Sequence, residues 1–216
     1  MVYKGIIFDM DGVLFDTETF YYQRRKDFLA SKGISIEHLA PSTFVGGRAS
    51  QVWELILRED IVNWDIDQLS QEYAAYKEEH PAPYKELVFP DTKKSLQTLV
   101  DMGLELVIGS NTDKSDVQKA IEDAEIAPYF KKVFSGTDCI ACKPHPAVYQ
   151  KAQAYLGYPA EEVLVIEDST KGIQAAVSAG LEIWAIEDKQ MGLDQSQADR
   201  LFSSLSEVVE EIARKR

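Results

Sequence analysis

Short apolar segments alternate along the chain with segments of helical periodicity. Runs of three to five mostly apolar residues, several of them β-branched, have the length of strands. We predict strands over residues 5–8, 104–108, 132–134, 163–166 and 182–186. Near-continuous apolar strands of this kind are typical of a parallel sheet that is covered on both faces.

Between these runs, apolar residues recur three and four positions apart, as on one face of a helix. The sets are Leu96, Leu99 and Val100; Val117, Ala120, Ile121 and Ala124; Ile173, Ala176 and Val177; and Leu205, Val208, Val209 and Ile212. Right-handed crossovers place such helices on both faces of a sheet, so the pattern predicts a doubly wound, Rossmann-like α/β fold. Ligands of these folds bind beyond the carboxyl ends of the strands.

Residues 17–83 break the alternation. This stretch has no strand-like run, and its pattern predicts helices over residues 19–31, 50–60 and 67–79. Three prolines, Pro81, Pro83 and Pro90, then return the chain to the α/β pattern. We therefore predict a small helical domain, residues 17–83, inserted into an α/β core that is formed by residues 1–16 and 84–216.

Composition and charge narrow the class of protein. The 216 residues are 45% hydrophobic and 27% charged, as in an ordinary globular protein. An excess of 36 Asp and Glu over 23 Lys and Arg gives a net charge of −13, which argues against a nucleic-acid partner. Nothing in the sequence indicates an obligate assembly, so we expect a monomer.

The apolar runs are far shorter than the roughly 20 residues of a membrane span, and the N-terminus lacks a signal-peptide pattern. Two cysteines, Cys139 and Cys142, are too few for a disulfide framework. We expect a cytoplasmic protein without a membrane partner, and we interpret the two cysteines as incidental thiols. The run Arg24-Arg25-Lys26 is predicted to be a solvated helix face.

Polar residues suited to phosphate chemistry follow four of the predicted strands. They are Asp9-Met10-Asp11-Gly12, Ser110-Asn111, Lys143 and Glu167-Asp168. The carboxyl ends of parallel strands meet at one edge of a sheet, so these residues should converge on one pocket. Asp9 and Asp11 are two residues apart and can face the same side, while Gly12 allows an immediate turn.

Four carboxylates at one place require a cation. Two unit charges ~4 Å apart repel by about 4 kcal/mol at an effective dielectric constant near 20. Oxygen ligands suit Mg²⁺, which commonly bridges carboxylates to a phosphate. Ser110, Lys143 and main-chain amides would then face the phosphate oxygens. One carboxylate of the Asp9–Asp11 pair can attack phosphorus while the other handles the proton, through an aspartyl-phosphate.

These motifs resemble those of the haloacid dehalogenase superfamily, and within it the β-phosphoglucomutase-like group. The matching strings are residues 8–17 (FDMDGVLFDT), Ser110, Lys143-Pro144, Glu167-Asp168-Ser169 with Gly172, and Ala179-Gly180. All four signature motifs of the superfamily occur in order. The resemblance implies that the helical insert is a cap that closes over the substrate.

The resemblance also implies roles for the motif residues. Asp9 would be the nucleophile, Asp11 the general acid and base, and Ser110 and Lys143 the groups that stabilise phosphate and nucleophile. The metal-site residues would be Asp9, Asp11 through its main-chain carbonyl, Glu167 and Asp168. Further candidate substrate- and phosphate-binding residues are Met10, Gly12, Asn111, Arg48 and Tyr21.

Two positions in the insert differ from the sugar-phosphate mutase pattern. Tyr21 stands where that pattern has a histidine, and Val45 stands before Gly46 where it has a lysine. The sequence therefore favours Mg²⁺-dependent hydrolysis of a small phosphorylated metabolite, with a sugar phosphate as the expected substrate. Two alternatives stay open: a β-phosphoglucomutase-type mutase, and a phospho-accepting switch without turnover. The insert argues against a switch, because a receiver domain needs little more than half this length.

Overall fold

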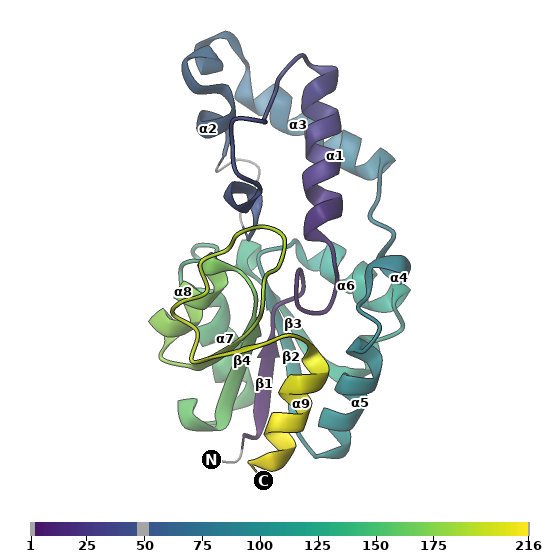
Figure 1. Ribbon diagram of the computed structural model, residues 1–216, viewed down its shortest axis with the longest axis vertical. Coiled ribbons are helices and arrows are strands. Elements are labelled where there is room, and N and C mark those ends of the chain that lie inside the picture. Colours follow the sequence, from purple (N-terminus) through teal and green to yellow (C-terminus); the bar gives the residue numbers. More distant parts are fainter. Residues whose placement is uncertain (1–2, 47–51, 216) are drawn as a thin grey trace.

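A six-stranded parallel sheet forms the centre of the computed structural model, which describes residues 3–46 and 52–215 (Figure 1). In spatial order the strands are β3 (Phe130–Ser135), β2 (Glu105–Ser110), β1 (Gly5–Phe8), β4 (Val163–Glu167), β5 (Glu182–Ile186) and β6 (Arg200–Phe202). Phe8 of β1 is level with Ile108 of β2 and Ile166 of β4. The carboxyl ends of these three strands therefore lie side by side.

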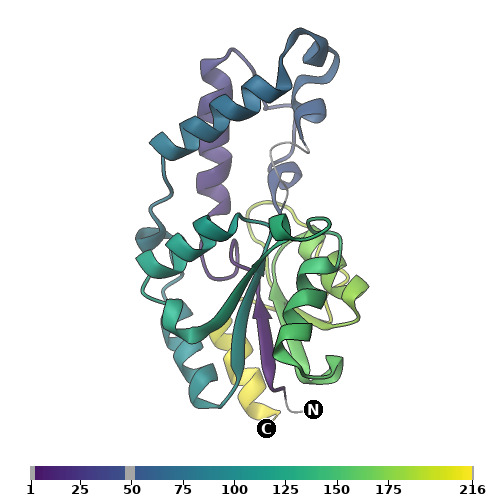
Figure 2. The same cartoon turned by 180° about the vertical axis from the view of Figure 1, so that it is seen from behind.

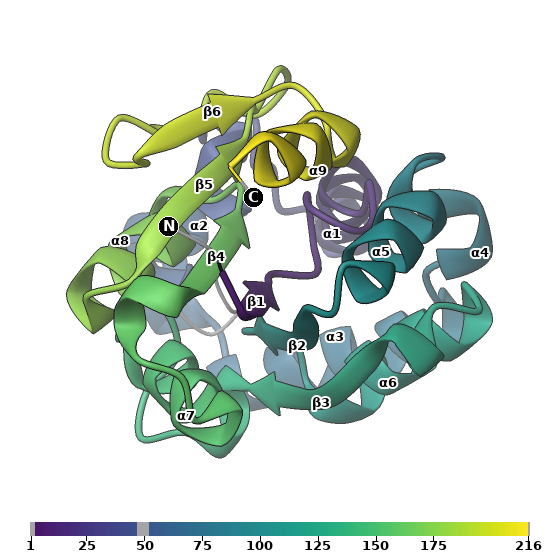
Figure 3. The ribbon, with the colours of Figure 1, turned by 90° about the horizontal axis from the view of Figure 1, so that it is seen from below.

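Helices cover both faces of the sheet (Figure 3). One face carries α5 (Thr92–Asp101), α6 (Lys114–Asp123) and α9 (Leu205–Arg214), and the other carries α7 (Ala147–Leu156) and α8 (Thr170–Ala179). Successive strand residues point to opposite faces, so Ile6 and Phe8 pack in the first layer and Ile7 in the second. The predicted doubly wound α/β fold is confirmed.

Three helices lie together beyond the carboxyl edge of the sheet (Figure 2). They are α1 (Glu18–Ser31), α2 (Trp53–Leu57) and α3 (Ile66–Glu79), and the short α4 (Tyr84–Leu87) follows on the return to the core. Phe28, Trp53 and Leu69 belong to a hydrophobic cluster of their own, separate from the two layers around the sheet. The division into a cap and a core at residues 17 and 83 stays a prediction.

The helices α4 and α7 were not predicted from the sequence, and the structure differs from the predicted elements at two further places. The helix expected over residues 50–60 is reduced to α2, because Arg58 has a positive φ of 52° and the chain continues as a 3₁₀ helix (Arg58–Asn63). Strand β6 was not predicted, because it has three residues and Leu201 in its middle is exposed. Within residues 3–46 and 52–215, the other 3₁₀ helices are Pro41–Phe44, Ala127–Tyr129, Gly136–Asp138 and Ala160–Glu162.

Helix lengths bear on the membrane prediction. Within residues 3–46 and 52–215, no helix combines the length and the apolar character that a bilayer crossing requires.

Candidate active site

Residues from three distant segments meet at the carboxyl edge of the sheet. Asp9 follows β1, Glu167 ends β4, and Lys143 comes from the loop after β3. The Lys143 Nζ lies 2.7 Å from Asp9 Oδ1 and 2.7 Å from Glu167 Oε1. All three side chains are buried. The fold therefore brings together three residues that were predicted to converge because each follows or ends a strand.

Lys143 and Glu167 form a buried ion pair. Burial works against the charge on Lys143, but Asp9 and Glu167 outweigh it and raise the Lys143 pKa. Burial likewise opposes the Glu167 carboxylate, yet Lys143 and the hydrogen bond from Tyr149 hold its pKa below the usual value. The pair is therefore ionised across the neutral pH range.

Further donors fix the position of Glu167. Its Oε1 accepts a hydrogen bond of 2.7 Å from the Tyr149 hydroxyl. Its Oε2 accepts from the main-chain N–H groups of Asp168 and Ser169, both at 2.9 Å, and from the Ser169 hydroxyl at 3.0 Å. Both carboxylate oxygens are thus engaged within the protein. This arrangement makes Glu167 a group that positions Lys143.

Two glycines leave the space that the second acidic pair occupies. A Cβ atom on Gly172 would lie 1.5 Å from Glu167 Oε1, and one on Gly12 would lie 1.9 Å from Asp168 Oδ2. Gly12 also has a φ of +76°, which disfavours any side chain. A larger residue at either position would displace an active-site carboxylate.

The acidic cluster has the properties of a cation site. Asp9, Glu167 and Asp168 each offer a carboxylate oxygen within 4.8 Å of the others. Within the described residues, Asp168 Oδ1 is buried without a hydrogen-bond partner. Burial raises the pKa of Asp168 well above its usual value, and the Glu167 and Asp9 charges raise it further. Lys143 supplies a single positive charge, so these hard oxygen donors fit a divalent cation.

Asp9 shares this environment. Burial raises its pKa to about 7, because the opposing effect of Lys143 is partly cancelled by the repulsion from Glu167. A bound cation would favour the ionised form, which is the nucleophilic one.

Asp11 is held by two hydroxyl groups. Its Oδ1 accepts from Thr17 Oγ1 at 2.5 Å and its Oδ2 from Thr112 Oγ1 at 2.7 Å. Burial raises the Asp11 pKa above the usual value, and these hydrogen bonds offset only part of the rise. A raised pKa favours the protonated form of Asp11, and this is the form that can give a proton to a leaving group.

Ser110 ends β2 at the same edge, and Asn111 directly follows it. The buried Ser110 Oγ accepts from the Thr112 N–H at 3.1 Å. The Asn111 Oδ1 accepts from the Lys143 N–H at 2.8 Å, and its Nδ2 donates to the Gly46 carbonyl at 2.9 Å. Asn111 therefore ties the Lys143 loop to a segment of the helical insert that follows the 3₁₀ helix Pro41–Phe44.

The remaining candidate residues lie in different settings. The Met10 side chain is packed in the core, so only its main chain could reach a phosphate. The Gly12 N–H is used in a 2.8 Å bond to the Phe15 carbonyl. The Tyr21 hydroxyl lies 3.1 Å from that of Tyr84. Arg48 lies outside the described residues.

Several residues that matter here were not predicted from the sequence. Tyr149 supports Glu167, and Thr17 and Thr112 support Asp11. Thr17 ends the first motif string, which was a usable signal. Thr112 and Tyr149 carry no such signal, because their contacts exist only in the folded chain.

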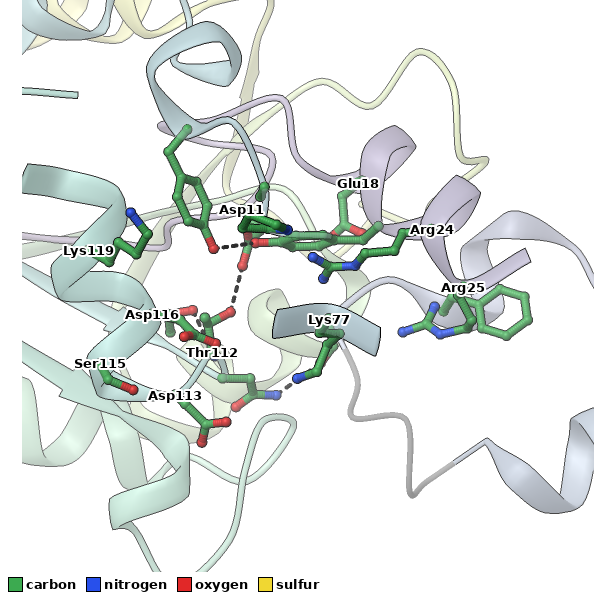
Figure 4. Close-up of a pocket in the computed structure, with 18 of the residues that line it drawn as sticks. Asp11, Glu18, Arg24, Arg25, Lys77, Thr112, Asp113, Ser115, Asp116 and Lys119 are labelled. Atoms are coloured by element: carbon green, nitrogen blue, oxygen red, sulfur yellow. Dashed lines mark hydrogen bonds between the residues drawn. The ribbon is translucent and has the colours of Figure 1, made fainter. Parts of the chain in front are cut away.

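A cavity of about 880 Å³ lies between this edge and the helices above it (Figure 4). Its volume is that of a small-molecule site. The core side contributes Asp9, Asp11, Ser110, Asn111 and Lys143, and the opposite side contributes Tyr21, Arg24, Arg25 and Lys77. The prediction that Arg24-Arg25-Lys26 is a solvated face is wrong for Arg25, which is 8% exposed.

Known proteins resemble this chain over most of its length. The family model described as haloacid dehalogenase-like hydrolase matches residues 6–186. A phosphoglycolate phosphatase of Yersinia pseudotuberculosis is 30% identical over 185 residues, which cover 82% of this chain and 78% of the relative. A phosphorylated carbohydrates phosphatase of Thermotoga maritima is 25% identical over 181 residues, 83% of this chain and 82% of the relative.

The fold has solved counterparts. The crystal structure of β-phosphoglucomutase from Clostridium difficile matches with a TM-score of 0.81 at 19% identity, covering 100% of this chain and 98% of that one. This agreement shows the same fold, and the family match confirms the resemblance to the haloacid dehalogenase superfamily. The chain belongs to the haloacid dehalogenase-like hydrolase family and is an enzyme of its phosphatase type.

Proposed function

We propose that this enzyme hydrolyses phosphate monoesters of small metabolites, sugar phosphates among them, through a phosphate carried transiently by Asp9. The observation that carries the proposal is the position of Asp9 on the cavity wall, 2.7 Å from Lys143 and two residues from Asp11. Relatives named for phosphoglycolate and for phosphorylated carbohydrates support a small phosphorylated substrate.

The residues divide the reaction into two steps. In the first, an Asp9 carboxylate oxygen attacks phosphorus, the bond from phosphorus to the ester oxygen breaks, and Asp11 gives its proton to the departing alcohol. In the second, Asp11 takes a proton from water, whose oxygen attacks the same phosphorus. The bond to Asp9 then breaks, which frees inorganic phosphate.

Charge on the transferred group is balanced by fixed groups. Lys143 and Ser110 lie where they can donate to phosphate oxygens. Asp9 and Asp168, with the main-chain carbonyl of Asp11, are the groups we propose to hold Mg²⁺. When bound, this ion would neutralise the acidic cluster and stabilise the transferring phosphoryl group. Glu167, the fourth predicted metal-site residue, has both carboxylate oxygens engaged within the protein, so we propose that it acts through Lys143.

Replacement of Asp9 tests this function. We expect Asp9→Asn to lower kcat on p-nitrophenyl phosphate at least about a thousandfold, because an amide oxygen is a poor nucleophile. Asp16→Asn is the matched control, since Asp16 is an exposed aspartate of the same string. Circular dichroism would verify that both variants fold. Activity of Asp9→Asn within tenfold of the wild type would exclude Asp9 as the nucleophile.

The alternatives fare differently. Membership of a family of hydrolases leaves the phospho-accepting switch without support. Tyr21 and Val45, which stand where the mutase pattern has histidine and lysine, support hydrolysis over isomerisation. The monomeric state, the cytoplasmic location and the lack of nucleic-acid and membrane partners stay predictions.

A further inference from the structure

Two neighbouring arginines of α1 reach the cavity but differ in what they bind (Figure 4). Arg24 Nη1 donates to the His80 carbonyl at 2.9 Å, so this side chain joins α1 to the end of α3. Arg25 is more than nine-tenths buried, and its Nε has no hydrogen-bond partner among residues 3–46 and 52–215. In the same ranges, no carboxylate lies within ion-pair distance of its guanidinium.

Aromatic rings hold the Arg25 guanidinium without using its hydrogen-bond donors. The guanidinium carbon lies 4.9 Å from the centre of the Phe44 ring and 6.0 Å from that of the Tyr73 ring. Stacking of this kind fixes the plane of the group, and its N–H donors remain free for a planar carboxylate or a phosphate. A buried cation without a partner is costly, so the site is built for an anion.

The charged neighbours of Arg25 leave it positive. Glu18, also on α1 and lining the cavity, is an acidic neighbour of Arg25, but no ion pair joins the two side chains within the described residues, and burial raises the Glu18 pKa to about 8, with Asp11 and Asp9 adding to the rise. Burial lowers the pKa of Lys171, and the nearby positive charge of Arg25 lowers it further. Lys77 and Glu78 of α3 also line the cavity, and their opposite charges add no net charge to it.

The distance to the reacting centre suits a second group of one small substrate. Arg25 follows Thr17, whose hydroxyl holds Asp11, by eight residues. Eight residues are about 12 Å along a helix axis. Side chains of a helix lean toward its N-terminus, which brings the guanidinium closer to the reacting end of the cavity. A phosphorylated sugar or sugar acid can span such a distance.

We propose that Arg25 binds a second anionic group of the substrate, a carboxylate or a second phosphate, at the end remote from the phosphate that is removed. The inference rests on the proposed function and narrows its substrate class from phosphate monoesters in general to those with two anionic ends. Arg25 is a specificity-determining residue in this proposal, and the reaction at Asp9 does not need it.

Matched substrate pairs test the proposal and separate the two kinds of anion. Glucose 6-phosphate is compared with 6-phosphogluconate, which adds a carboxylate, and fructose 6-phosphate with fructose 1,6-bisphosphate, which adds a phosphate. We expect the wild type to favour at least one doubly anionic member by tenfold or more in kcat/KM. Arg25→Met should remove that preference, a loss of about 10- to 100-fold that falls mainly on KM. Arg25→Lys should restore part of it.

Controls separate recognition from folding. Lys26→Met changes the next residue of α1, an exposed lysine paired with Glu37, and should leave every substrate unchanged. All variants should hydrolyse p-nitrophenyl phosphate within about twofold of the wild type. An equal loss on this substrate, or on the singly anionic sugars, would show that Arg25 only supports packing, and a wild type without preference would also refute the proposal.

A binding measurement keeps the test independent of turnover. If the wild type released phosphate from no substrate, the proposed function would fail. Calorimetry with the Asp9→Asn variant would still decide the role of Arg25. The doubly anionic compounds should bind at least tenfold more weakly once Arg25→Met is added to that variant. Unchanged affinity would refute the second anion site.

Discussion

The two walls of the cavity are built on different principles. On the core wall, Lys143 is paired with Asp9 and Glu167, and Asp11 accepts from two threonine hydroxyls. On the opposite wall, Arg25 is buried with no ionic partner among the described residues. The charged groups of the first wall are bound mostly to one another, whereas Arg25 on the second wall has no ionic partner within the described residues.

This difference separates chemistry from recognition. The phosphoryl group is the same in every substrate of the family, so groups that act on it can be fixed in advance. The leaving group differs between substrates, so the residues facing it must vary, as Tyr21 on the cavity wall does. Substitutions on the core wall should therefore slow the hydrolysis of every substrate, and substitutions on the opposite wall should slow the hydrolysis of some substrates only.

The largest effect is expected when the core wall loses the positive charge of Lys143. Lys143→Met leaves two buried carboxylates without their cationic partner, so we expect about 3–5 kcal/mol less stability and a kcat at least about a thousandfold lower. Denaturant unfolding and p-nitrophenyl phosphate turnover measure the two effects. Lys93→Met, which breaks an exposed pair with Glu125, should cost less than about 1 kcal/mol. Equal costs for both variants would contradict the buried charge network.

A smaller effect is expected from added volume on the core wall. Gly12 and Gly33 have nearly the same φ, +76° and +75°, so alanine brings similar backbone strain to both, about 1–2 kcal/mol. A Cβ on Gly12 would collide with Asp168, whereas nothing lies within 4 Å of one on Gly33. Gly12→Ala should lower kcat about a hundredfold and weaken Mg²⁺ activation, and Gly33→Ala should change neither. A similar loss in both would show that strain alone is responsible.

The same contrast shows what the sequence could predict. The strand-end rule located Asp9, Lys143 and Glu167, because parallel strands bring their carboxyl ends to one edge whatever the loops contain. It missed Thr112, whose bond to Asp11 joins residues 101 positions apart, and no local pattern records such a contact. The charged run Arg24-Arg25-Lys26 predicted a solvated position for Arg25, because the aromatic rings that bury it come from other segments of the insert.

A moderate pH effect should distinguish the walls. Burial raises the pKa of Asp9 to about 7 and of Glu18 to about 8, against about 4 in an unfolded chain. A raised acid pKa stabilises the fold below the unfolded value, and this contribution is lost as pH rises through the folded value. With a chelator present, Tm should fall by about 5 °C or more between pH 5 and pH 8.

Added Mg²⁺ should restore the part of this loss that arises on the core wall. Glu18→Gln should remove the part that arises at Glu18, so that the variant with Mg²⁺ has a nearly flat Tm between pH 5 and pH 8. Differential scanning fluorimetry provides the measurement. A chelated protein whose Tm rises over this range would contradict the raised pKa values.

The smallest effect is expected at Tyr21, because a specificity change there need not alter the core wall. Its hydroxyl lies 3.1 Å from that of Tyr84, and Tyr21→His places an imidazole where the mutase pattern has one. An imidazole titrates near neutral pH and can take the proton of a sugar hydroxyl, which favours return of the phosphate to the sugar. With β-glucose 1-phosphate and a bisphosphate primer, the ratio of glucose 6-phosphate to free phosphate should rise severalfold. Tyr84→Phe breaks the same hydroxyl contact without adding a base, so an equal rise of the ratio in that variant would assign the effect to packing. An unchanged ratio in Tyr21→His would mean that other residues of this wall decide between hydrolysis and isomerisation.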